Sequence, residues 1–153
     1  MTKYDFAAII FLICAAMALI AGTYRQIDKK KMQLLCRGRL NHLGSTYFIY
    51  RQNTNNDAEG LKKWQDVLKQ YSPDSDFGVC PGESSGVFNY QLNLAGQFAD
   101  KDNRAILFFD SEPNEVSYCK DFDKQSVSWR HFQGANFLLS DGSVVYYKNG
   151  NTP

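Results

Sequence analysis

An uncharged apolar segment near the N-terminus places the strongest constraint on how this chain can fold. Residues 6–22 read FAAIIFLICAAMALIAG and contain no charged or strongly polar side chain. As a helix, this segment would extend about 25 Å, close to the thickness of the hydrocarbon core of a bilayer. We therefore expect residues 1–23 to form a short membrane-spanning helix. It includes Phe6, Ile10, Cys14 and Gly22.

A cleaved signal peptide is the competing interpretation of this segment. Lys3 supplies a positive charge before the apolar run, and Ala21 and Gly22 are small enough to flank a cleavage site. However, Leu19 or Ile20 would occupy the third position before the cut, where a small residue is required. The sequence therefore favours a retained membrane helix.

The charged residues divide the rest of the chain into a basic stem and an acidic head. Residues 23–51 hold seven Lys/Arg and one Asp, whereas residues 52–153 hold nine Lys/Arg and 14 Asp/Glu. Nucleic-acid binding needs a basic face, and nucleotide binding usually needs a glycine-rich phosphate loop after a strand, so we expect neither partner. The stem can contact anionic lipid headgroups, although a solvated helix beyond the membrane is the preferred interpretation.

Two signals disagree about the side of the membrane on which the head lies. The apolar segment is followed by Arg25, Lys29, Lys30 and Lys31, and the positive-inside rule alone would place these residues in the cytoplasm. Cys36, Cys80 and Cys119 instead suit an oxidising compartment, although their odd number leaves one cysteine unpaired.

Apolar periodicity predicts two helices after the membrane segment. The first continues from it and carries one stripe, formed by Cys36, Leu40, Leu43, Tyr47 and Tyr50. Asp57 can cap the second helix, which ends at Ser72 and Pro73. Its expected buried face consists of Leu61, Trp64, Leu68 and Tyr71.

The period then changes from that of a helix to that of strands. Residues 87–93 and 105–110 indicate short strands, and residues 136–148 indicate a hairpin with Asp141 and Gly142 in a tight turn. Phe108 and Phe109 would point to opposite faces, which leaves one of them available to a partner. We expect residues 24–153 to form one α+β domain, in which the long helix precedes a small antiparallel sheet.

His131 and Asp141 form the one pair in the sequence that suggests acid–base catalysis. The serines that flank the Asp-Gly turn, Ser140 and Ser143, do not lie in a nucleophile motif. A small extracytoplasmic enzyme would need a nucleophile or metal that the sequence does not supply. We therefore expect no enzymatic activity. In the preferred interpretation, Asp141 and Gly142 shape the turn and His131 packs at the base of the hairpin.

Metal-binding patterns are weak. The loop that begins at Asp100 has Ala105 where a calcium loop needs glycine, and Ser111 where it needs glutamate. The spacing of Cys and His residues suggests no zinc site. A looser calcium site at Asp121 and Asp123 stays open, but solvated carboxylates are the preferred interpretation, so we expect no cofactor.

Three separated segments together resemble bacterial prepilin-like proteins related to type II secretion pseudopilins. The first is the apolar N-terminal helix with its basic stem, and the second is CRGRLNHLG, which begins at Cys36. The third is RHFQGANFLLSDGSV, which is similar to a closing motif of histidine, nine residues and Asp-Gly. The closing motif is matched at Arg130, His131, Gly134, Asn136, Asp141 and Gly142.

This resemblance implies a pilin-like fold, in which a long helix is half in the membrane and half packed on a small antiparallel sheet with a C-terminal hairpin. It implies a single-pass protein of the bacterial cytoplasmic membrane, with its N-terminus inside and its head in the periplasm or outside. It also implies a disulfide between Cys36 and Cys80, which leaves Cys119 unpaired. The implied function is that of a structural subunit of a type II secretion or type IV pilus-like assembly, and its partners are lipid and like subunits.

The N-terminal residues depart from the family pattern and keep a second function open. Asp5 stands where glycine precedes the leader-peptidase cut, and Ile10 stands where glutamate is expected. That glutamate would neutralise the N-terminal amine of a neighbouring subunit inside the membrane. A chain without cleavage between Asp5 and Phe6 would be a stand-alone, membrane-anchored binding module that has lost filament assembly.

Overall fold

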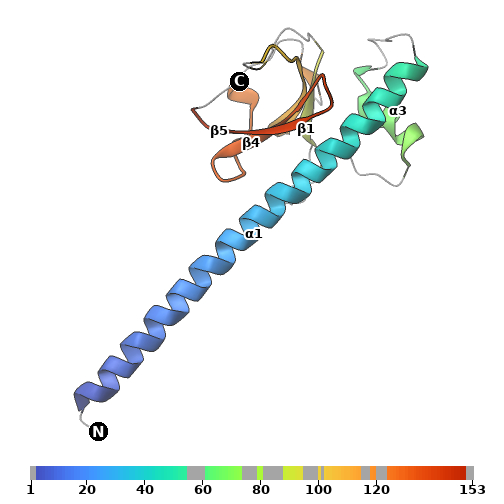
Figure 1. Ribbon diagram of the computed structural model, residues 1–153. Coiled ribbons are helices and arrows are strands. Elements are labelled where there is room, and N and C mark those ends of the chain that lie inside the picture. The colour runs from blue at the N-terminus through green and yellow to red at the C-terminus, as the bar shows by residue number, and fades with distance from the viewer. Residues whose placement is uncertain are drawn as a thin grey trace.

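The structure is a computed structural model that describes residues 3–54, 61–73, 79–80, 88–94, 100, 102–114, 118–119 and 124–150. It is an α+β protein, in which a small sheet and a short helix gather around the C-terminal half of one long helix (Figure 1). The N-terminal half of the long helix projects away from this head. The overall shape is therefore a rod with a head at one end.

The long helix, α1 (Lys3–Asn53), is continuous over 51 residues because its sequence contains no proline to interrupt it. The expected stripe is confirmed, since Cys36, Leu40, Leu43, Tyr47 and Tyr50 are all buried. Gly44 lies on the same side, and a methyl group there would come within 2.8 Å of the Leu138 side chain. The helix and the sheet therefore pack closely at this point.

The sheet has five strands in the order β3-β1-β2-β4-β5, formed by β1 (Phe88–Asn93), β2 (Ile106–Asn114), β3 (Tyr118–Cys119), β4 (Gly134–Leu139) and β5 (Val144–Lys148). Three pairs are antiparallel, as expected, but β3 pairs with β1 in parallel. The expectation of an antiparallel sheet is therefore wrong at this edge. A two-residue strand carries too little periodicity to be recognised in the sequence.

The second helix, α3 (Trp64–Tyr71), is shorter than its periodicity predicts. Its residues Trp64 and Leu68 are fully buried, and the preceding Leu61 is also buried, whereas Tyr71 is partly exposed at the end of the helix. The proposed cap, Asp57, lies outside the described residues. The Trp64 ring packs edge-on against Phe108, which joins α3 to the sheet.

The hairpin between β4 and β5 closes through a longer loop than the expected two-residue turn. The Gly142 N–H donates to the Leu139 carbonyl at 2.9 Å, and the Leu139 N–H donates to the Ser143 carbonyl at 2.9 Å. Gly142 has a φ of 84°, a left-handed conformation that glycine adopts at little cost. Residues 140–142 therefore form a three-residue loop with glycine at its left-handed position.

Both faces of the sheet are covered. The face toward the helices shares one apolar core with α1 and α3, to which Phe108 belongs. The opposite face forms a second core, in which Phe109 and Phe137 lie beneath Val127 and Trp129. Phe108 and Phe109 do point to opposite faces, but both are fully buried, so neither is available to a partner.

Candidate functional site

A buried polar cluster lies where α1 meets the sheet, and it contains part of the closing motif. Cys36 of α1 forms a disulfide with Cys80, which confirms the pairing that the resemblance implies. His131 is the first residue of the turn that leads into β4, and its Nε2 lies 3.5 Å from the Cys80 Sγ. All three residues are buried. The disulfide and the histidine therefore fill one site between the stem helix and the sheet.

Asp110 of β2 completes the cluster. Its Oδ2 lies 3.6 Å from the His131 Nε2, and it accepts hydrogen bonds from the Asn136 backbone N–H at 2.7 Å and from the Asn136 Nδ2 at 2.9 Å. A disulfide sulfur carries no hydrogen, so Nε2 must hold the proton if His131 donates to either neighbour. Asn136 thus holds the carboxyl group of Asp110 beside the imidazole.

Burial sets the protonation states of this pair. It raises the pKa of Asp110 from 3.8 to about 6, although hydrogen bonds from Asn136 and the charge of Arg130 oppose this rise. It lowers the pKa of His131 from 6.5 to about 4, and the charge of Arg130 acts in the same direction. Burial therefore favours the neutral form of both groups.

The two groups are expected to change the stability with pH in opposite directions. Folded Asp110 holds a proton that the unfolded chain has lost between pH 3.8 and about 6, so its contribution is present at low pH and disappears as pH rises. Folded His131 lacks a proton that the unfolded chain binds between about 4 and 6.5, so its contribution is lost as pH falls. Between pH 4 and 6 the two effects oppose each other.

Single substitutions should separate the two contributions. Relative to the wild type, His131→Gln should lose stability as pH rises from 4 to 6, because only the Asp110 contribution remains. Asp110→Asn should instead gain stability between pH 4 and 6.5. Urea unfolding at several pH values measures both slopes, and the double variant provides the control. If both single variants follow the pH dependence of the wild type, burial does not shift the pKa values of Asp110 and His131 in these directions.

Asp141, the other end of the closing motif, has different partners from His131. Its Oδ1 accepts hydrogen bonds from the Ser143 N–H at 2.9 Å and the Ser143 Oγ at 2.6 Å. Its Oδ2 lies 3.1 Å from a guanidinium nitrogen of Arg104, which also binds Asp100. The acid–base pair of His131 and Asp141 is therefore not formed in this structure.

Gly134 and Arg130 have structural contacts beside the cluster. A methyl group at Gly134 would lie 2.3 Å from a ring carbon of Tyr146, so the ring covers this glycine. The Tyr146 hydroxyl donates to the His131 carbonyl at 2.6 Å. Arg130 donates to the Ser111 carbonyl of β2. Together with Asn136, these residues fix the path of the chain before and into β4.

The cluster also contains the atoms of a possible metal site. The ligand atoms of Cys36, Cys80 and His131 lie within 4.8 Å of one another. Metal binding by cysteine requires free thiolates, so the disulfide would first have to be reduced. The looser calcium site considered at Asp121 and Asp123 falls outside the described residues.

Sequence reasoning missed Asp110 and Arg104 as members of these clusters. Asp110 follows the apolar run of β2, and alternation places it on the same face as Phe108, which is buried against the helices. A carboxylate at such a position indicates a buried polar partner. Arg104 gave no comparable signal, because its contact with Asp141 spans 37 residues of sequence.

The protein is therefore a small α+β protein, in which a disulfide joins one long helix to Cys80, ahead of the first strand of a mixed five-stranded sheet. No protein-family model, curated protein or solved structure matches the chain.

Proposed function

We propose that this protein is a membrane-anchored, non-enzymatic, pilin-like structural subunit, which associates with like subunits through α1. The observation that carries the proposal is the exposure of the apolar half of α1. This helix is long and apolar enough to cross a membrane, and none of its apolar window is buried in the protein. Phe11, Leu12 and Leu19 are each at least two-thirds exposed. Such a surface is stable in lipid or against another apolar helix.

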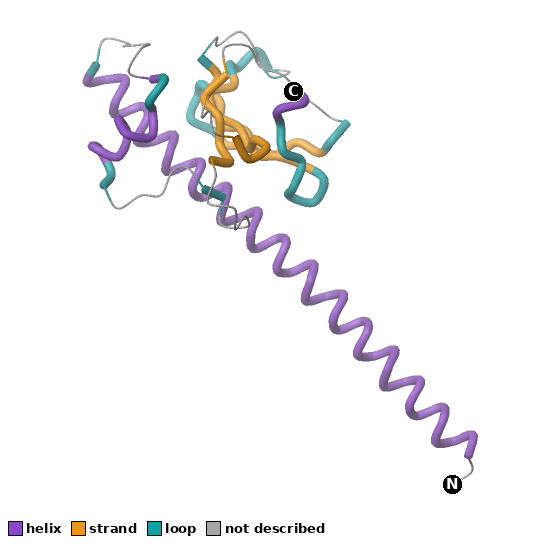
Figure 2. The backbone as a smooth tube through the Cα atoms, turned by 180° about the vertical axis from the view of Figure 1, so that it is seen from behind, coloured by secondary structure: helices purple, strands orange, loops and turns teal. Residues whose placement is uncertain are grey.

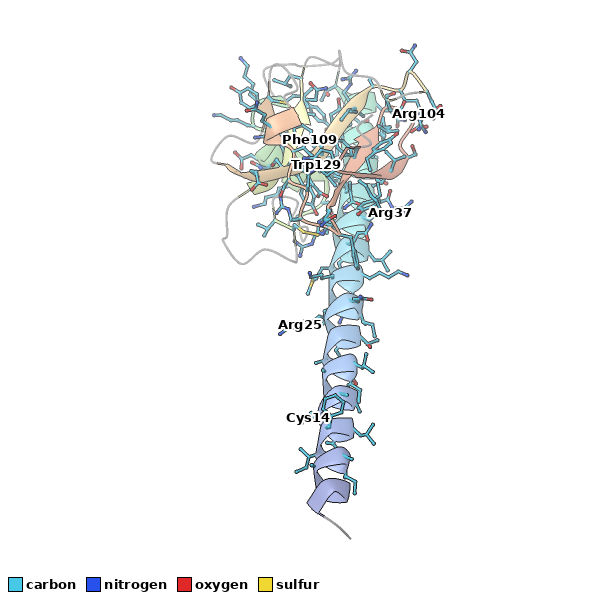
Figure 3. All side chains as sticks on the ribbon, turned by 90° about the vertical axis from the view of Figure 1, so that its left-hand side faces the viewer. Cys14, Arg25, Arg37, Arg104, Phe109 and Trp129 are labelled. Atoms are coloured by element: carbon cyan, nitrogen blue, oxygen red, sulfur yellow. A yellow bond between two sulfur atoms is a disulfide. The ribbon has the colours of Figure 1, made fainter. Side chains whose placement is uncertain are left out.

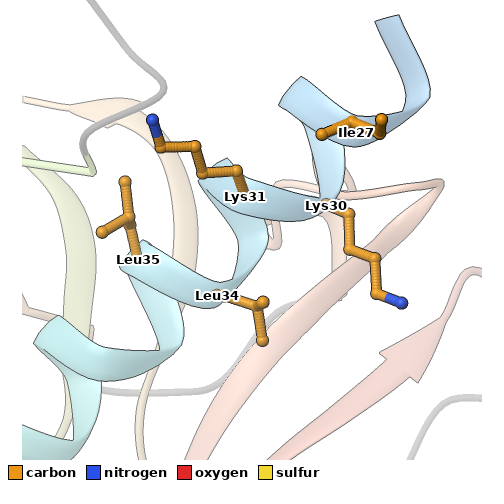
Figure 4. A pocket seen from close by; sticks show the side chains of 5 residues that line it. All are labelled: Ile27, Lys30, Lys31, Leu34 and Leu35. Atoms are coloured by element: carbon orange, nitrogen blue, oxygen red, sulfur yellow. The ribbon is translucent and has the colours of Figure 1, made fainter. Parts of the chain in front are cut away.

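Exposed apolar side chains continue beyond the expected membrane segment. Ile27, Leu34 and Leu35 line a shallow groove together with the stems of Lys30 and Lys31 (Figure 4). The basic stem and the acidic head have complementary charges, so the head of one subunit can approach the stem of the next. This surface supports lateral association of like subunits.

The proposed location is a bacterial cytoplasmic membrane, with the N-terminus inside and the head in the periplasm or outside. The Cys36–Cys80 disulfide supports this orientation, because disulfides persist in oxidising compartments. The buried cluster at His131 has a structural role in this proposal, since it ties the stem helix to the sheet.

Cysteine crosslinking in native membranes tests the subunit proposal. Single cysteines are placed at successive positions from 9 to 24 in a chain that carries Cys14→Ala and Cys119→Ala, so that no other free thiol remains. If α1 packs against a second α1, oxidation should give dimers at positions that recur about every 3.6 residues. The chain without an added cysteine is the control.

The alternative function is a stand-alone anchored binding module. Asp5 and Ile10 favour it, because both replace the residues that prepilin processing and assembly would use. In that case, no position in the scan should give a dimer, while the chain stays in the membrane fraction.

A further inference from the structure

We propose that the head rests on the membrane surface, and that the turn His131–Gly134 contacts anionic phospholipid headgroups through Phe132. This inference rests on the proposed membrane anchoring of α1, but it concerns a different surface. It assigns to the head a lipid contact that anchoring by α1 does not require.

The turn has an unusual backbone for its sequence. His131 and Gly134 exchange two backbone hydrogen bonds, of 3.0 and 2.9 Å, so Phe132 and Gln133 are its two central residues. Both have positive φ values, 52° and 61°. Turns with two positive φ values strongly prefer Asn and Gly, and a bulky side chain is strained there. The local backbone conformation therefore disfavours phenylalanine at position 132, the tip of the turn.

The rest of the head holds this turn in place. The Tyr146 hydroxyl donates to the carbonyls of His131 and Phe132, and the Asn149 N–H donates to the Gln133 carbonyl at 2.6 Å. These contacts involve the backbone of the turn, so they do not require phenylalanine at its tip. The Phe132 residue remains 37% exposed. A strained apolar residue that the hydrogen bonds of the turn do not require points to a role of its side chain beyond the turn itself.

The position of Phe132 along α1 indicates what it meets. The loop between η1 (Lys124–Ser126) and β4 extends from the sheet toward the N-terminal half of α1 (Figure 2). At its tip, Phe132 lines a hollow together with Thr23, Gln26, Ile27 and Lys30 of α1. This tip is therefore close to the end of the apolar segment.

The first charged residue after that segment is Arg25, which lies on the bare part of α1 below the head (Figure 3). From Tyr24 to Ile27 the helix rises only about 4.5 Å. The headgroup layer on each side of the hydrocarbon core is about 5 to 7 Å thick. A helix that crosses the membrane up to Tyr24 would therefore bring the tip of the turn to the level of the headgroups.

The side chains around Phe132 suit this layer. A second hollow beside the turn is lined by Lys29, Trp129, Arg130, Phe132 and Gln133. Aromatic rings are favoured at membrane interfaces, and the Lys29 ammonium is attracted to lipid phosphates. Arg130 faces inward instead, where it donates to the Ser111 carbonyl. Lys29 and Lys30 beside the turn give this surface a positive charge, which favours anionic lipid as the occupant. The acidic head of a second copy is the competing occupant, and the protein-to-lipid ratio below distinguishes the two.

Quenching of tryptophan fluorescence by lipid tests the proposal. The full chain is placed in vesicles of phosphatidylethanolamine and phosphatidylglycerol, some of which carry a nitroxide on the headgroup. The emission of Trp129 is the part lost in Trp129→Phe, and the fully buried Trp64 serves as the internal reference. We expect headgroup nitroxide to remove about half of the Trp129 emission, as for an interfacial ring.

Phe132→Asn should reduce this quenching about twofold or more, because the tip loses its apolar contact with the interface. The variant should keep its fold, since Asn tolerates the left-handed conformation. Tyr71→Asn is the matched control, because Tyr71 is 38% exposed but lies on α3, and its quenching should equal that of the wild type.

The remaining outcomes separate this inference from the proposed anchoring. If the chain resists extraction at alkaline pH but Trp129 is not quenched, anchoring stands and the lipid contact is wrong. Extraction of the chain would overturn both. Quenching that Phe132→Asn leaves unchanged would overturn the role of Phe132. Quenching that falls as the protein-to-lipid ratio rises would mean that a second copy covers the turn, which also overturns the proposal.

Discussion

Replacing both Cys36 and Cys80 by alanine is expected to lower the free energy of unfolding by about 4 kcal/mol. The disulfide joins α1 to the chain 44 residues later, so it restricts a long loop in the unfolded state. Both cysteines are fully buried at the meeting point of the helix and the sheet, and the truncation also removes packing against His131. Urea unfolding in detergent, followed by Trp64 fluorescence, measures the loss.

The other two cysteines provide the control for this prediction. Cys14 is exposed on α1 and Cys119 is partly buried in β3, and neither forms a disulfide. Replacing both by alanine should change the unfolding free energy by less than about 1 kcal/mol. Equal losses in the two double variants would contradict a specific stabilising role of the Cys36–Cys80 bond.

Gly134→Ala is expected to destabilise the head by about 3 kcal/mol, the upper part of the range for an overpacked core. The added methyl group would lie 2.3 Å from a ring carbon of Tyr146 and 2.4 Å from its hydroxyl oxygen. The ring cannot move away without breaking its hydrogen bonds to the carbonyls of His131 and Phe132. Thermal and urea unfolding both measure this effect.

Two further variants test its cause. In a Tyr146→Ala background, Gly134→Ala should cost much less, because the ring that it meets is absent. Gly38→Ala makes the same chemical change on α1, where no atom lies within 4 Å, and should stabilise the helix by about 1 kcal/mol. If Gly134→Ala behaves like Gly38→Ala, the ring does not limit the space at Gly134.

The sequence was sufficient to predict α1 and its buried stripe, because both depend on local properties. The spacing of Cys36, Leu40, Leu43, Tyr47 and Tyr50 defines one helical face, and all five residues are buried. The short apolar runs located β1 and the first part of β2 for the same reason, although β2 continues to Asn114, beyond the predicted end at residue 110. The apolar N-terminal segment likewise forms part of an exposed helix.

Features that depend on contacts across the chain could not be predicted. The parallel pairing of β3 with β1 depends on contacts that a two-residue strand does not encode. The closing motif suggested a pair between His131 and Asp141, but His131 instead lies beside Asp110, a residue of β2. Position 110 alternates with Phe108 onto the helix-facing side, yet the partner that it meets there is set by the register of β2 against β4.

The uninterrupted course of α1 would couple the head rigidly to the bilayer in the proposed anchored state. Residues 23 to 36 are helical throughout, so no break in the helix separates the apolar half from the disulfide. Residues 18 positions apart are separated by about five full turns, which places Ala18 directly below Cys36. In that state, a contact that rotates the apolar half about its axis would also rotate the head, because the helix between them is continuous. Helix packing within the membrane would thereby select the side of the head that each neighbour meets.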